Sequence, residues 1–210
     1  MKDAILNRFL KYISIDTQSD ENSETTPSTK HQFDLAKVLH EELIDLGLQN
    51  VSLDENCYIM ATLPSNVDKK VPVIGFVSHM DTSPDMPGNA STACLIENYQ
   101  GEHVVLNEEG ITLSPKDFPE MLEYIGQTLI VTDGKTLLGA DDKAGVAIIM
   151  ETAAWLIEHP EIPHGPVRIC FTCDEEIGRG VDKITPQEIG ATACYTLDGH
   201  GSGEIDVETF

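Results

Sequence analysis

The stretch TLIVTDGKTLLGADDKAG, residues 128–145, predicts how the central part of the chain folds. It reads as a strand, a tight turn at Asp133–Gly134 and a return strand, because Asp-Gly between apolar runs is a strong hairpin signal. The adjacent carboxylates Asp141 and Asp142 follow, and then a long apolar helix. Their ordinary role would be to cap that helix, since Asp accepts backbone N–H groups at a helix start. The alternative role is metal ligation, for which Asp141 is the better candidate.

Apolar periodicity along the rest of the chain predicts an α/β fold, with a mostly parallel or mixed sheet flanked by helices. Helices are expected over residues 3–14 and from a cap at Ser28 or Thr29 to a stop at Gly47. A third helix is expected over 143–158, and a short fourth after a capping box at Thr185. The third carries on one side Val146, Ile149, Met150, Ala153 and Ile157. Strands are expected at 51–53, 57–63, 71–77, 167–173 and 193–197, the last three of them buried, with helix-like turns near Phe118–Tyr124. The polar loop from Asp16 to Lys30 is long enough that function or mobility is the usual reason.

Composition narrows the function classes. Among the 210 residues, 13 are Lys or Arg and 36 are Asp or Glu, which gives a net charge of −23. This charge argues against nucleic acid and membrane surfaces as partners, since both need basic patches. Residues 1–210 contain no secretory signal or membrane-spanning run. The 5 cysteines form no framework spacing, so reduced thiols in a cytoplasmic protein are expected.

Metal-ligand chemistry follows three of the predicted strands and precedes one helix. The residues are His79 and Asp81, Glu175 and Glu176, Asp198, and the pair Asp141–Asp142. In open α/β sheets, sites form at the carboxyl ends of strands, so these side chains are expected to meet. Gathering several carboxylates without a cation would be costly, because like charges repel and desolvate one another.

The spacing within these groups suggests separate roles. A His79 ring nitrogen can bind a metal while Asp81 accepts the other ring N–H. Of Glu175 and Glu176, one can bind the metal and the other can act as general base towards a water that the metal acidifies. The alternatives are a surface histidine and a solvated acidic turn. The pair Cys170 and Cys173 is expected to be core rather than a redox or zinc site, and His200 to be exposed.

Four ordered motifs give the chain a resemblance to the metallopeptidase family M20: SHMDTSPDMPG (78–88), TLLGADDKAGVA (136–147), FTCDEEIGRG (171–180) and YTLDGHGSGEI (195–205). Within that family the chain is most similar to aminopeptidases that act on tripeptides. The resemblance implies a two-zinc site in which His79 and Asp198 are ligands of the first Zn²⁺, Asp141 bridges both and Glu176 binds the second. It implies Asp81 as the group that orients His79, Glu175 as the general base, and a cis bond between Asp141 and Asp142.

Relatives in this family are about twice as long, so residues 1–210 are expected to be the N-terminal part of a single zinc-peptidase catalytic domain. A lid or dimerisation domain, the C-terminal completion of the sheet and a last His ligand of the second zinc would then be absent. The resemblance implies an aminopeptidase that removes the N-terminal residue of tripeptides, with a homodimer possible in the full-length form. The alternatives are a catalytically inactive fragment that keeps partial metal binding, or another M20 hydrolase of dipeptidase or aminoacylase type.

Overall fold

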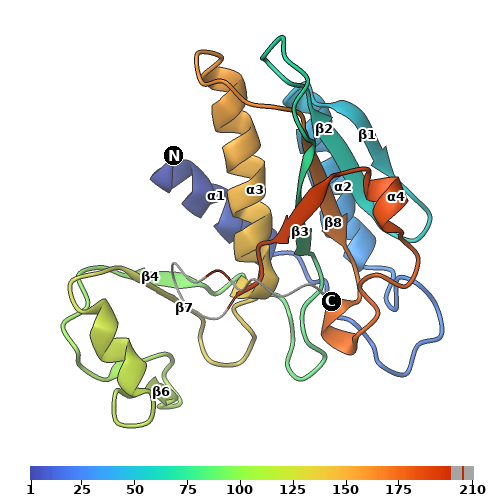
Figure 1. Ribbon diagram of the computed structural model, residues 1–210. Helices are drawn as coiled ribbons and strands as arrows, with labels where there is room; N and C mark the ends of the chain where they lie inside the picture. The colour runs from blue at the N-terminus through green and yellow to red at the C-terminus, as the bar shows by residue number, and fades with distance from the viewer. Residues whose placement is uncertain (200–204, 206–210) are drawn as a thin grey trace.

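The computed structural model describes residues 1–199 and 205, and a five-stranded mixed sheet forms its centre (Figure 1). The strand order is β1-β2-β8-β3-β9. The strands are β1 Gln49–Leu53, β2 Ile59–Leu63, β3 Ile74–His79, β8 Val167–Thr172 and β9 Ala193–Thr196. β3 runs parallel to both β8 and β9, whereas β2 is antiparallel to β1 and β8. The prediction of an α/β fold with a mixed sheet is confirmed.

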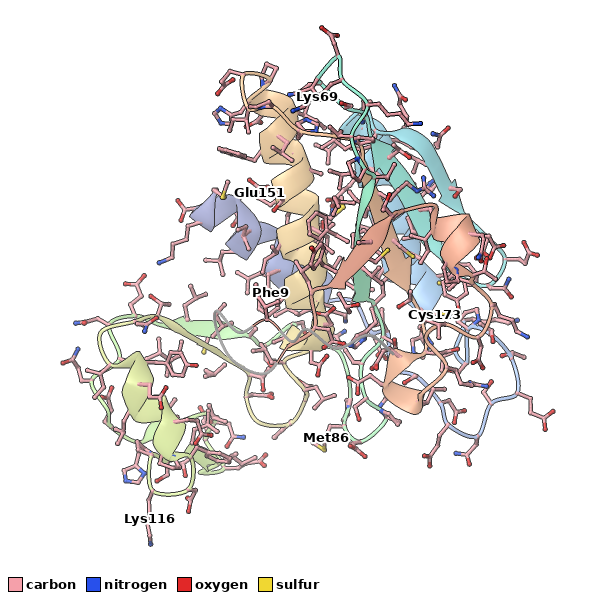
Figure 2. The ribbon with its side chains drawn as sticks, in the orientation of Figure 1. Phe9, Lys69, Met86, Lys116, Glu151 and Cys173 are labelled. Carbon is pink, nitrogen blue, oxygen red and sulfur yellow. The ribbon has the colours of Figure 1, made fainter. Side chains whose placement is uncertain are left out.

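Three long helices share one apolar core with the sheet. They are α1 Lys2–Ile13, α2 Gln32–Asp45 and α3 Ala140–Glu158. The core cluster contains residues of all three helices together with alternate residues of β2 and β8. Arg8 of α1 ties the helices together, since it pairs with Glu42 of α2 and donates to Glu151 of α3 at 3.1 Å. Figure 2 shows Phe9 and Glu151 where α1 and α3 meet.

Strand β9 lies at the edge of the sheet, and its four residues are exposed. The prediction of a buried strand over 193–197 is therefore wrong in its burial, although the strand itself forms. An apolar run cannot reveal whether a strand is covered, because burial depends on which elements pack beside it. The short helix α4, Pro186–Ile189, precedes β9 and begins with the predicted capping box at Thr185, and Arg168 of β8 donates to its Ile189 carbonyl oxygen.

The part of the chain that connects β3 to α3 forms a small lobe, which projects away from the main sheet (Figure 1). It contains β4 Cys94–Ile96, β5 Val104–Val105, β6 Thr112–Leu113, the 3₁₀ helix η1 Pro119–Tyr124 and β7 Leu129–Val131. The predicted hairpin around Asp133–Gly134 is wrong, because β7 pairs with β4 and no return strand forms over 134–139. Gly134 does take a positive φ of 76°. Thr132 closes the turn through its side chain, which accepts from Gly134 and donates to Thr136.

Two further details differ from the sequence predictions. Helix α2 begins at Gln32 with His31 as N-cap, not at Ser28 or Thr29, because the Ser28 side chain bonds elsewhere in the molecule. On α3, Ile157 is 39% exposed, while the other four residues of the predicted face are buried. Within the described residues, no helix combines the length and apolarity that a membrane crossing requires.

Candidate metal centre

Three side chains meet at the carboxyl edge of the parallel strands. His79 is the last residue of β3, Asp141 lies at the start of α3, and Asp198 follows β9 by two residues. One ligand atom from each lies within 4.8 Å of the others. His79 Nε2 is 2.8 Å from Asp141 Oδ1 and 3.7 Å from Asp198 Oδ2. The parallel arrangement of β3 and β9 is what brings residues so distant in sequence together.

Glu175 and Glu176 reach the same place from the end of β8. They form the start of a short 3₁₀ helix, η2 Glu175–Ile177. Glu175 Oε2 lies 3.8 Å from His79 Nε2. Burial, followed by the negative charge of Asp141, raises the pKa of Glu176 to about 7. Both glutamates therefore stand beside the cluster formed by His79, Asp141 and Asp198.

Asp81 connects the histidine to the glutamate pair. Its fully buried carboxylate accepts hydrogen bonds from the backbone N–H groups of Glu175 at 3.0 Å and Glu176 at 3.1 Å. His79 Nδ1 lies 3.1 Å from the backbone carbonyl oxygen of Asp81 and 3.4 Å from its carboxylate. Asp81 thus holds the ring through its carbonyl oxygen and holds η2 through its side chain.

The two adjacent aspartates at the start of α3, Asp141 and Asp142, differ in their surroundings and in their roles. Their peptide bond is cis, as the family resemblance implies. Asp142 is buried, and it accepts from the backbone N–H groups of His79 at 3.3 Å and Gly145 at 3.2 Å. Burial raises the pKa of Asp142 to about 7. The capping role therefore falls to Asp142, while the Asp141 side chain is 70% exposed and bonds to His79 Nε2 at 2.8 Å.

The donor set fits a divalent cation. Burial alone would lower the pKa of His79, but hydrogen bonds to Asp141 and Asp81 raise it to about 11. Without a metal ion, the positive charge of protonated His79 balances part of the negative charge of the carboxylates. A bound metal ion would balance that negative charge instead. One imidazole with several carboxylates suits Zn²⁺, and Co²⁺ or Mn²⁺ also accept such ligands.

Sequence reasoning treated other residues differently. Cys170 and Cys173 are buried free thiols, and Cys173 donates to the carbonyl oxygen of Asn56, which agrees with a core role. His200 lies outside the described residues. Two buried charged residues beside the site, Lys143 and Asp174, are not among the site residues that the sequence predicts. Asp174 could have been found from its place directly before the glutamate pair. A third acidic residue in a row is, however, also typical of an exposed turn.

Residues 127–206 match the family described as "Peptidase family M20/M25/M40". The chain is 56% identical to peptidase T of Clostridium botulinum over 100% of its length, and 54% identical to peptidase T of Alkaliphilus oremlandii over 98%. The chain is similar to peptidase T over its whole length.

This similarity extends to solved structures. The aminopeptidase PepT of Bacillus cereus aligns with a TM-score of 0.65 and 27% identity, over 96% of this chain and 44% of its own. A tripeptidase of Staphylococcus aureus aligns with a TM-score of 0.62 and 28% identity over the same shares. The chain spans about half the length of the curated peptidase T relatives it matches, 52% of the Clostridium protein and 51% of the Alkaliphilus protein.

Proposed function

We propose that this chain forms part of the catalytic domain of a metal-dependent aminopeptidase that removes the N-terminal residue from tripeptides. The observation that carries the proposal is the convergence of His79, Asp141 and Asp198, with Glu175 3.8 Å from the histidine. The peptidase T similarity over the whole chain supports the same reaction. Residues 1–210 would contribute the N-terminal part of a single catalytic domain.

In this proposal the metal is zinc, held at a first position by His79 and Asp198. Asp141 would bridge to a second position, where Glu176 is the other ligand within the described residues. Catalytic zinc sites normally take three protein ligands, so the second position requires a further ligand. When bound, such a pair of ions supplies Lewis acidity that polarises a scissile carbonyl and lowers the pKa of water.

The protein's own groups supply the proton transfers. Glu175 stands at the rim of the cluster, half-exposed, and burial raises its pKa above the ordinary value for a glutamate. It would accept a proton from the attacking water and later deliver that proton to the amine nitrogen of the leaving dipeptide. A general base is most effective when its pKa lies near the working pH, so the direction of this shift favours the role.

The substrate and location are proposed from the same observations. The partner is a small peptide rather than a nucleic acid or a membrane, and a homodimer is proposed for the full-length form. The free cysteines of the structure support a reducing, cytoplasmic location.

The test is peptide hydrolysis by the intact protein, with the zinc content measured alongside it. We expect release of the N-terminal residue from tripeptides and much slower cleavage of dipeptides and acylated amino acids. Glu175→Gln should lower kcat by about 100- to 10,000-fold while the zinc content stays unchanged, because it removes the base but no ligand.

The matched control is Glu161→Gln. Glu161 lies beyond the far end of α3, 68% exposed and paired with His159, so its loss should leave turnover unchanged. A zinc-loaded intact protein that cleaves dipeptides or acylated amino acids in preference to tripeptides would point to another M20 hydrolase. Zinc binding without hydrolysis of any of these substrates would contradict the proposal.

A further inference from the structure

The polar loop from Asp16 to His31 runs alongside the segment that carries His79 and Asp81. Thr17 Oγ1 donates to the carbonyl oxygen of Met80 at 2.7 Å, and Ser19 N donates to the carbonyl oxygen of Thr82 at 3.0 Å. Gln18 and Thr82 form an isolated parallel β-bridge. Thr17 and Ser19 are buried, so the loop is attached to the protein body on this side.

The same loop is attached a second time, to the segment that carries the glutamate pair. Ser28 N donates to Asp174 Oδ2 at 2.8 Å, and Ser28 Oγ donates to Asp174 Oδ1 at 2.5 Å. Gln32 Nε2, at the start of α2, donates to Asp174 Oδ1 at 2.8 Å. Arg179 Nη1 also donates to the carbonyl oxygen of Ser23, in the same loop, at 2.9 Å. The loop thus contacts both segments that lead into the metal centre.

Asp174 is a fully buried carboxylate, which makes these hydrogen bonds important. Its nearest cation, Arg179 Nη2, lies 3.9 Å away, beyond hydrogen-bonding distance. A buried charge is costly unless hydrogen bonds satisfy it, so the donors from Ser28 and Gln32 replace the solvation that Asp174 loses. Removing either the Asp174 carboxylate or its donors therefore leaves polar groups buried and unpaired.

The backbone at Asp174 points the next two residues at Asp81. Asp174 has a φ of 58°, in the left-handed region that residues other than glycine rarely adopt. With the chain turned in this way, the N–H groups of Glu175 and Glu176 both reach the Asp81 carboxylate. One buried carboxylate therefore ties the glutamate pair to the loop, and another ties it to the strand that ends in His79.

We propose that Asp174, held by Ser28 and Gln32, is a positioning residue that fixes Glu175 and Glu176 against His79. This inference rests on the proposed function for its kinetic consequence, but the structural link itself does not. A displacement of about 1 Å at a reacting group can reduce a rate about 100-fold. The loop therefore acts as a support of the active site.

The test compares Asp174→Asn, Ser28→Ala and the double variant in the intact protein. Asparagine keeps the shape of Asp174 but presents an NH₂ group to donors. We expect Asp174→Asn to lower kcat by about 10- to 100-fold with KM within about threefold, and Ser28→Ala to act in the same direction but less. The double variant should be close to Asp174→Asn alone, because both changes remove the same contact. Hydrogen–deuterium exchange should become faster at the amides of Glu175 and Glu176 in each variant.

The control is Asn66→Ala, which removes side-chain hydrogen bonds to Ile162 and His164. These residues lie in the loops before β3 and β8, at the opposite edge of the sheet. This variant should lower Tm yet leave kcat and exchange at Glu175 and Glu176 unchanged.

The proposal is overturned if Asp174→Asn lowers only Tm, with kcat and exchange at Glu175 and Glu176 as in the wild type. If Asp174→Asn does not fold, Ser28→Ala decides by the same two measurements. A wild-type protein that cleaves no tripeptide would contradict the proposed function alone, since exchange at the glutamate amides still decides whether Asp174 positions them.

Discussion

The imidazole of His79 is almost completely buried, yet burial does not determine its protonation. Burial lowers its pKa, and the hydrogen bonds to Asp141 and Asp81 outweigh that effect. In the absence of a cation, these bonds favour the protonated ring. A metal has to displace that proton, so metal affinity should increase with pH until the histidine is neutral.

Lys143, two residues after Asp141, differs from His79, because the effect of burial on its pKa outweighs that of the neighbouring charges. Its side chain is fully buried, and Nζ donates to the carbonyl oxygen of Ile15 at 2.7 Å. Burial lowers its pKa to about 8, despite the charges of Asp16 and Asp81. Between pH 8 and the ordinary lysine pKa near 10.4, the unfolded chain binds a proton that the folded chain has lost. Lys143 should therefore make the folded state more stable as pH rises through this window.

We predict that the wild type gains about 2 kcal/mol in free energy of unfolding, relative to Lys143→Met, between pH 7 and pH 9.5. Below pH 8 the folded protein must bury the charged ammonium, whereas above it the neutral amine remains. Urea unfolding of both proteins at the two pH values measures the difference, and the other titrating groups cancel. A difference that stays constant with pH would show that the amine does not titrate in this window.

At the scale of elements, α3 has to approach the end of β9 closely. Gly145 makes this possible, because a Cβ at that position would collide with the carbonyl oxygen of Leu197, Ser78 Oγ and Asp142 Oδ1. One of these groups is backbone and another caps the helix, so neither can move without displacing part of the metal centre. The helix interior thus tolerates a glycine here for packing reasons rather than flexibility.

We predict that Gly145→Ala lowers the free energy of unfolding by about 1–3 kcal/mol, as overpacking does elsewhere. In an ordinary helix the same change would stabilise the protein by about 1 kcal/mol, so the sign of the effect is informative. Denaturant unfolding measures it. The comparison variant is Gly199→Ala, where a Cβ would meet nothing within 4 Å among the described residues, so little change is expected. Equal stability of the two variants would contradict the tight contact between α3 and the end of β9.

The same elements show how far the sequence could predict the structure. The meeting of His79 and Asp198 could be expected, because residues that follow parallel strands share one edge of the sheet, whereas Asp141 joins them from the start of α3. The sequence could not exclude a return strand after Gly134, because the strand that actually pairs with β7 is β4, which lies far from it along the chain. The attachment of Ser28 to Asp174 joins positions 146 residues apart, and local capping rules favoured Ser28 as a helix cap instead. Long-range hydrogen bonds leave no periodic signal in a sequence.

At the scale of the whole molecule, the net charge of −23 favours any cation, so a specific site must be distinguished from general attraction. Screening separates the two, because surface charges are largely screened by salt while a partly buried site is screened much less. Ligand type separates them further. Ca²⁺ prefers oxygen ligands, whereas Zn²⁺ also binds the imidazole of His79.

We predict that zinc at about 100 times its dissociation constant stabilises the chelator-treated intact protein by about 2.7 kcal/mol, since it binds the folded state. For a folding unit of 210 residues that corresponds to a Tm increase of about 5–10 °C. Thermal unfolding in 0.5 M NaCl should show this increase with zinc and little with Ca²⁺. His79→Ala removes the ring nitrogen that only zinc uses, so its Tm should not respond to zinc. If that variant responded like the wild type, the acidic surface would be binding the ion, and the cluster around His79 would not be the metal centre.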